Sequence, residues 1–151
     1  MSALCDEDIV LWSERQGSLL RRRTAGELVN DTELDWPNIV GEVESIGRAE
    51  QEQLINRRAI LFVHLLKWRF QADGRGNGWR LTILEQRRHV RRIVSRGPSL
   101  RPRLDEILAE AYGDAVLIAE RETELPGETF PSICPWTFDE AMQAELLGLE
   151  P

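Results

Sequence analysis

The stretch that decides the fold runs from Pro37 to Gln71 and reads PNIVGEVESIGRAEQEQLINRRAILFVHLLKWRFQ. Within it, one set of residues recurs at spacings of three, four and seven: Val40, Val43, Gly47, Leu54, Leu61, Leu65 and Trp68. In an α-helix of 3.6 residues per turn, positions with these spacings share one side. The sequence therefore predicts a single long amphipathic helix, about 50 Å in length, with this stripe as its core face.

Both ends of this stretch carry further signals. Asp35 is expected to be the N-cap, and Pro37 suits the first turn because its φ is fixed near the helical value. From Ala59 to Phe70, apolar residues occupy several sides of the helix. A helix that is apolar on most sides is enclosed by its neighbours, so other helices are expected to pack along this second half.

Helical periodicity continues before and after the long helix. One helix is predicted over residues 7–25, and another from Trp79 to a point just before Gly97 and Pro98. The second of these carries an inward-facing stripe of Ile83, Gln86, Val90, Ile93 and Val94. The glycine-rich stretch at residues 72–78 is predicted to be a loop between the long helix and this one.

The last third of the chain contains two more helical signals. Ser99 is expected to cap a helix with Pro102 in its first turn, followed by the apolar stripe Leu104, Ile107, Leu108, Ala111, Tyr112, Ala115, Ile118 and Ala119. A proline-broken apolar segment comes next, which is typical of chain that drapes over a core. Thr137 and Glu140 then form a capping-box pattern for a short helix to about Leu147.

These elements predict an all-α fold without strands. We expect a four-helix-bundle-like domain with a long central helix and a short C-terminal fifth helix. Residues 1–151 are predicted to be a single domain. Its core covers about residues 7–122, and the proline-rich segment with the last helix covers residues 123–151.

Composition and cysteine usage limit the class of protein. The chain has 151 residues, of which 42% are apolar and 30% charged, as is ordinary for a globular protein. Cys5 and Cys134 lie far apart without metal-binding spacing, which favours reduced thiols over a disulfide or a zinc site. The first residues are acidic, unlike a signal peptide, and the longest apolar run is too short to span a bilayer. We expect a cytoplasmic protein with no membrane association and no cofactor.

Charge is segregated along the chain. The net charge is -7, from 19 basic and 26 acidic residues. The stretch from Arg57 to Arg103 contains thirteen basic residues and two acidic ones. The stretch from Leu104 to Pro151 contains twelve acidic residues and one basic residue, Arg121. Basic and acidic helices that lie side by side and partly neutralise each other are the ordinary explanation of such a pattern.

Several motifs occur together along nearly the whole chain. They are Asp8, Trp12, Gln16 and Leu20; Glu42-Val-Glu44-Ser-Ile-Gly47 followed by Glu50; His64-Leu-Leu-Lys67-Trp68; Trp79 with Glu85-Gln86-Arg87; Pro98-Ser99-Leu100; Tyr112; Phe130-Pro131; and Cys134-Pro135-Trp136. In this constellation the chain resembles a bacterial family known as domain of unknown function 29. The resemblance implies an all-helical fold, and it implies no established biochemical activity.

A column of polar residues is the first candidate site. Seven-residue steps lead back from His64 to Arg57 and Glu50, so the three are expected to stack beside the apolar stripe. In a structural role they would form hydrogen bonds or ion pairs with one another or with Gln86 of a neighbouring helix. In a functional role, His64 with Glu50 and Glu85 would hold a small molecule or a metal ion. The Glu-x-x-His pairs of di-iron bundles are absent from the sequence, so no metal ligands are predicted.

The second candidate site is an arginine face on the helix that begins at Trp79. It consists of Arg80, Arg87, Arg88, Arg91 and Arg92, with Arg96, Arg101 and Arg103 just beyond. Such a face is able to bind phosphates or an acidic partner helix. The acidic total, the lack of interleaved aromatic residues and the lack of a helix-turn-helix pattern all count against nucleic acid.

No nucleophile–base pair, carboxylate pair or metal-ligand set is evident in the sequence. We therefore predict a non-catalytic interaction or scaffold protein, whose partner is an unknown protein or a second copy held by a basic-to-acidic contact. The first alternative is a nucleic-acid-associated accessory protein that uses the arginine face. The second alternative is an enzyme or a metal-binding bundle.

Overall fold

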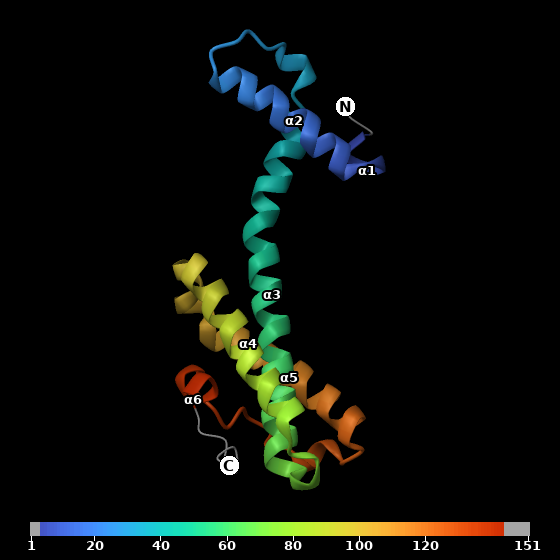
Figure 1. Ribbon diagram of the computed structural model, residues 1–151, viewed down its shortest axis with the longest axis vertical. Helices are drawn as coiled ribbons and strands as arrows, with labels where there is room; N and C mark the ends of the chain where they lie inside the picture. The colour runs from blue at the N-terminus through green and yellow to red at the C-terminus, as the bar shows by residue number, and fades with distance from the viewer. Residues whose placement is uncertain (1–3, 144–151) are drawn as a thin grey trace. The chain divides into compact units, whose positions relative to one another are not determined.

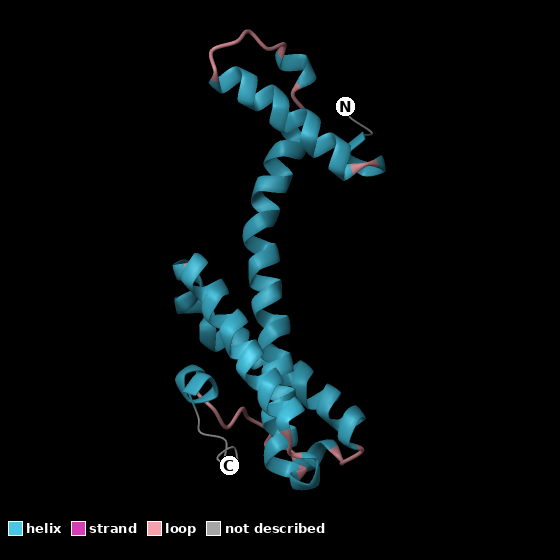
Figure 2. Ribbon diagram, viewed as in Figure 1, coloured by secondary structure: helices cyan, strands magenta, loops and turns pink. Residues whose placement is uncertain are grey.

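The computed structural model describes residues 4–143, and this part of the chain is helical with no strand (Figures 1 and 2). The main helices are α2 (Ile9–Thr24), α3 (Trp36–Phe70), α4 (Asn77–Arg96) and α5 (Leu104–Thr123), and α1 (Leu4–Glu7) and α6 (Phe138–Gln143) are short. Short 3-10 helices cover Asp31–Glu33, Ala72–Gly74, Pro98–Arg103 and Gly127–Thr129. The predicted all-α class and the long helix are confirmed. No helix within residues 4–143 is long and apolar enough to cross a membrane.

The chain forms two compact units, and the division falls between Arg48 and Ala49, inside α3. The first unit contains α1, α2 and the start of α3. The second contains the rest of α3 together with α4, α5 and α6. The expectation of a single domain over residues 1–151 stays a prediction.

In the first unit, the helix predicted over residues 7–25 is divided in two at Asp8. The Asp8 carboxylate accepts a hydrogen bond of 2.9 Å from the backbone N–H of Leu11, so Asp8 is the N-cap of α2. At the other end, Gly26 adopts a left-handed φ of 84°, which glycine does at little cost. The connection from α2 to α3 contains one short 3-10 helix, Asp31–Glu33.

The core of the second unit lies where α4 and α5 pack beside the second half of α3 (Figure 1). Its fully buried side chains include Leu54, Leu61, Phe62, Leu66, Ile83, Val90, Ile107, Ala111, Ala115 and Ala119. The predicted inward stripe of α4 is buried throughout, and most of the stripe of α5 is buried as well. One contact also joins a basic to an acidic helix, because Lys67 of α3 pairs with Glu122 of α5 at 3.1 Å.

The predicted core face of α3 is correct only in its second half. Leu54, Leu61, Leu65 and Trp68 are buried, whereas Val40 and Val43 are 52% and 63% exposed and Gly47 is exposed too. In the first unit the half-buried positions of α3 are instead Asn38, Ile39, Gly41 and Ser45, and all of these except Ile39 lie about half a turn away from the stripe. The neighbouring elements of that unit thus pack on the opposite side of the helix.

The start of α5 also differs from the prediction. Residues Pro98–Arg103 form a 3-10 helix that leads directly into α5, so Ser99 does not cap the α-helix. A 3-10 helix accommodates Pro102 here, whereas a proline inside an α-helix would remove a hydrogen bond.

The predicted capping box of α6 is present. The Thr137 backbone N–H donates to the Glu140 carboxylate at 3.0 Å, and the Glu140 backbone N–H donates to the Thr137 hydroxyl at 3.2 Å. The described part of this helix ends at Gln143. Its predicted continuation to Leu147 lies outside the described residues.

The turn between α3 and α4 is tightly packed around Trp79. A Cβ atom placed on Gly74 would lie 2.2 Å from the Cη2 atom of the Trp79 ring. The ammonium group of Lys67 lies 4.8 Å from the centroid of the same ring, within cation–π range. Only glycine fits at position 74 while the indole keeps this place.

Candidate functional site

The predicted polar column is not joined by direct bonds. Glu50, Arg57 and His64 are half-buried on α3, and Gln86 is buried on α4. Within residues 4–143, no hydrogen bond or ion pair links any two of these four. Glu50 instead pairs with Arg96 at 3.4 Å, and Nδ1 of His64 lies 2.9 Å from a carbonyl oxygen one turn back in its own helix.

The proposed metal site of His64, Glu50 and Glu85 is likewise not assembled. Glu85 is exposed, and its carboxylate lies 3.7 Å from Nε2 of His89, one turn further along α4. Among the described residues, no three His, Cys, Asp or Glu side chains are grouped as metal ligands would be. The residues of the polar column therefore have separate surroundings and do not form one site.

The predicted arginine face is divided by α6. Arg87 is only 7% exposed, and its Nε donates to the carbonyl oxygen of Ala141 at 2.9 Å. Arg91 donates to the carbonyl oxygen of Met142 at 3.0 Å. The prediction that Arg87 lies on the outer face is wrong, because α6 packs there and its carbonyl oxygens at Ala141 and Met142 accept hydrogen bonds from Arg87 and Arg91. Burial lowers the pKa of Arg87, and the charge of Arg91 lowers it further.

Of the remaining arginines of α4, Arg88, Arg92 and Arg96 are exposed and Arg80 is half-buried. Arg80 donates two hydrogen bonds to the side-chain oxygen of Asn77. Arg88 and Arg92 are exposed and have no ion-pair partner within residues 4–143. The spacing places them on the same side of α4 as Leu81 and Leu84, which are 50% and 43% exposed. These four residues, Leu81, Leu84, Arg88 and Arg92, are called the α4 face.

A second amphipathic surface lies on α3 in the first unit. Trp36, Val40, Val43 and Ile46 are 41%, 52%, 63% and 61% exposed and are called the α3 face. Glu42 and Glu44 lie on its two sides, both exposed, and neither has an ion-pair partner in the described part of the chain. The α3 face is thus an apolar strip bordered by carboxylates.

Arg58 is a buried polar residue that was not predicted from the sequence. Its side chain is fully buried, with its guanidinium carbon 5.2 Å from the centroid of Phe62 and 5.0 Å from that of Phe138. Nη1 donates to the carbonyl oxygen of Leu104 at 3.2 Å, while Nε and Nη2 have no hydrogen-bond partner in the described part of the chain. Burial lowers the pKa of Arg58 to about 10.

A signal for Arg58 was present in the sequence. It follows Leu54 by four residues and precedes Leu61 by three, so it fills a gap in the predicted core stripe of α3. A charged residue in such a position is either displaced from the core or enclosed by it. The structure shows the second outcome.

Cys134 lies in the segment that covers this part of the core. Burial raises the pKa of its thiol, and Sγ donates to the carbonyl oxygen of Trp136 at 3.3 Å. The Trp136 ring stacks on Phe62, with centroids 6.1 Å apart and planes within 7°. Because nucleophilic cysteines require a lowered pKa, this environment favours a packing role for Cys134.

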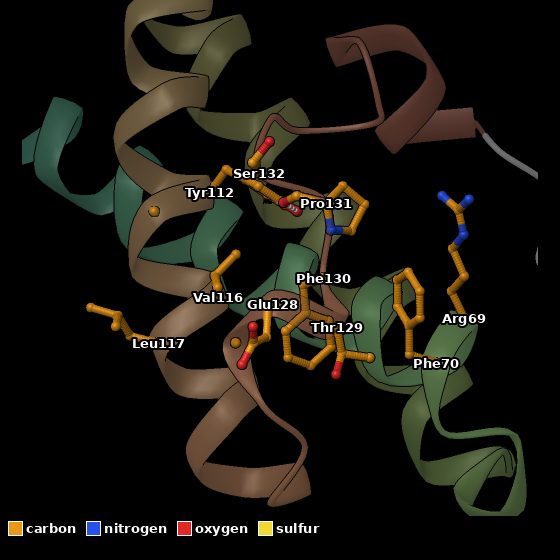
Figure 3. A pocket seen from close by; sticks show the side chains of 12 residues that line it. Arg69, Phe70, Tyr112, Val116, Leu117, Glu128, Thr129, Phe130, Pro131 and Ser132 are labelled. Atoms are coloured by element: carbon orange, nitrogen blue, oxygen red, sulfur yellow. Dashed lines mark hydrogen bonds between the residues drawn. The ribbon is translucent and has the colours of Figure 1, made fainter.

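An open hollow of about 800 Å³ lies where α5 meets residues 127–132 and the end of α3 (Figure 3). The Tyr112 hydroxyl donates to the Pro131 carbonyl oxygen at 2.5 Å, and the Phe70 and Phe130 rings meet edge to face at 5.5 Å. Burial raises the pKa of Tyr112. Glu128 is the one carboxylate among the described lining residues, so the hollow offers no acid–base pair.

The first unit has a hollow of about 980 Å³ lined by α2 and residues 32–38. Its wall contains the Asp35 carboxylate, which accepts hydrogen bonds from Asn38 at 2.8 Å and Trp12 at 2.9 Å. The backbone N–H of Asp35 donates to the side-chain oxygen of Gln16 at 2.9 Å. The bonds from Asn38, and then that from Trp12, lower the pKa of Asp35. This network joins α2 to the entry of α3, so it is a structural tie.

The fold and these surfaces define an all-α protein with two exposed amphipathic helix faces. Its sequence matches the family Domain of unknown function DUF29 over residues 4–147, and the chain belongs to that family. Comparisons with curated proteins and with solved structures find no significant match.

Proposed function

We propose that this chain is a non-catalytic interaction protein that presents the α3 face to a helix of a partner. One observation carries the proposal. The apolar stripe that is buried from Leu54 onward continues on α3 as Val40 and Val43, which are more than half exposed. An exposed apolar strip on a helix is characteristic of protein–protein contact sites, and an amphipathic partner helix is a usual occupant.

The border of the α3 face specifies the chemistry of that partner. Glu42 and Glu44 leave the strip flanked by negative charge, so a helix with Lys or Arg beside its apolar anchors is favoured. Opposite charges at the rim mainly set association rate and partner choice, while the apolar contacts supply affinity.

Site-directed photo-crosslinking tests this proposal. A benzophenone side chain at Val43 should give a discrete crosslinked polypeptide in native cells, and the same group at Leu117 should not. Leu117 is a matched control, because it is 68% exposed on α5, outside the α3 face. Adding Ile46→Asp should reduce the Val43 crosslink about tenfold, which corresponds to about 1.4 kcal/mol. Equal yields at the two positions, or none at Val43, would contradict the proposal.

Nucleic-acid binding is the second candidate function. It is supported by Arg88 and Arg92, which are exposed and carry no ion pair within residues 4–143. Binding of a labelled duplex in about 50 mM salt, lost on Arg88→Glu with Arg92→Glu and retained on Arg121→Glu at an exposed position of α5, would support it. No binding at this salt concentration would end it.

A further inference from the structure

We infer that the helix received by the α3 face is α4 of a second copy of this chain, so that two copies associate through reciprocal α3-to-α4 contacts. The inference rests on the proposed function and names its partner. It follows from the presence, on one chain, of both halves of a complementary helix pair.

Both faces carry exposed apolar side chains, and the two faces are of similar length. The α3 face offers Trp36, Val40, Val43 and Ile46, and the α4 face offers Leu81 and Leu84 one turn apart. Residues 36–46 and 81–92 both extend for about 17 Å at about 1.5 Å per residue. Apolar side chains on two such helices pack by ridges into grooves, and this burial removes them from water.

The charged parts of the two faces are opposite in sign. Arg88 and Arg92 extend the leucine strip of α4, while Glu42 and Glu44 border the apolar strip of α3. All four are exposed, and within residues 4–143 none of them has an ion-pair partner. Complementary charges suppress wrong partners, and each face repels a second face of its own kind.

A second copy also supplies the matching number of faces, because each chain carries one α3 face and one α4 face. Pairing of two copies about a two-fold axis is the commonest arrangement of homo-oligomers.

Light scattering of the purified full chain measures the assembly directly. At about 5 to 200 µM in about 50 mM salt, the mass should rise with concentration from 17.3 kDa towards twice that value. Glu42→Arg with Glu44→Arg should raise the dimer dissociation constant at least about tenfold, and Arg88→Glu with Arg92→Glu should do the same. Arg101→Glu and Leu117→Asp are the matched controls and should leave the dimer unchanged.

Mixing the two reversed variants is the decisive step. In each variant alone, the α3 and α4 faces carry charges of the same sign and repel each other. In the mixture, the basic α3 face of one variant meets the acidic α4 face of the other. The mixture should therefore regain the dimer mass, which also shows that both variants are folded. A mixture that stays monomeric overturns the inference, as does a wild-type mass of 17.3 kDa at every concentration.

Two further outcomes also overturn it. One is a dimer that survives both charge reversals, because another surface then holds it. The other is a Val43 crosslink to a different polypeptide while the purified chain stays monomeric, which leaves the proposed function standing without the second copy. If the purified chain stays monomeric and Val43 gives no crosslink in cells, both proposals are wrong.

Discussion

The guanidinium of Arg58 lies over the ring of Phe62, one turn further along α3, inside the core of the second unit. The ring face attracts the cation, and one nitrogen reaches the carbonyl oxygen of Leu104. The pKa of about 10 keeps the group charged at neutral pH. A buried charge with two nitrogen atoms left without hydrogen-bond partners in the described part of the chain carries a desolvation cost that these contacts only partly offset.

Replacing Arg58 by methionine should therefore stabilise the protein. Arg58→Met keeps much of the side-chain volume and removes the unsatisfied donors, so the free energy of unfolding should rise by about 1 to 2 kcal/mol. Arg58→Ala should lower it by about 2 to 4 kcal/mol, because it leaves a cavity. Urea denaturation at pH 7 measures both values. Arg57→Met, at a half-buried neighbour, is the control and should change stability by less than about 0.5 kcal/mol. A loss of more than about 1 kcal/mol in Arg58→Met would show that the charge itself stabilises the fold.

The attachment of α6 should depend on Arg87. Its hydrogen bond to the Ala141 carbonyl oxygen joins positions 54 residues apart and involves a buried charged donor. Arg87→Met should lower the free energy of local opening of α6 by about 1.5 to 3 kcal/mol, the range for a hydrogen bond to a charged group. Amide hydrogen exchange of residues 138–143 should then accelerate by about 10- to 150-fold. The adjacent exposed Arg88→Met should leave these amides unchanged, and equal rates in the two variants would contradict the role given to Arg87.

Acid should loosen the first unit through Asp35. Hydrogen bonds from Asn38 and Trp12 lower the pKa of this carboxyl below its ordinary value of 3.8. The stabilisation is therefore complete above about pH 4 and is lost as the pH falls through the lower folded value. Hydrogen exchange of α2 across this range should show the loss. Asp35→Asn should abolish this pH dependence of exchange, whereas Asp114→Asn on α5 should leave it unchanged. A profile that is the same in all three proteins would contradict the assignment.

The helices were predictable because their periodicity is local, but the coverage of each face depends on distant segments. Val43 and Leu54 belong to one stripe of α3, and no local feature indicates that only Leu54 is buried. Arg87 has the same chemistry as the exposed Arg88, and only the arrival of α6 distinguishes them. Arg58 was overlooked because charge argued against burial although its position on the stripe argued for it. Sites that depend on tertiary contacts, including the unlinked polar column, were correspondingly the least predictable.

The close approach of Gly74 to Trp79 has a consequence for the evolutionary record of this family. Any side chain at position 74 would collide with the indole, so the two positions cannot drift independently. Relatives that keep tryptophan at position 79 should keep glycine at 74. Relatives that acquire a larger residue at 74 should carry a smaller one at 79, and a lysine at 67 would then keep its pair with Glu122 but lose the ring beneath its ammonium group.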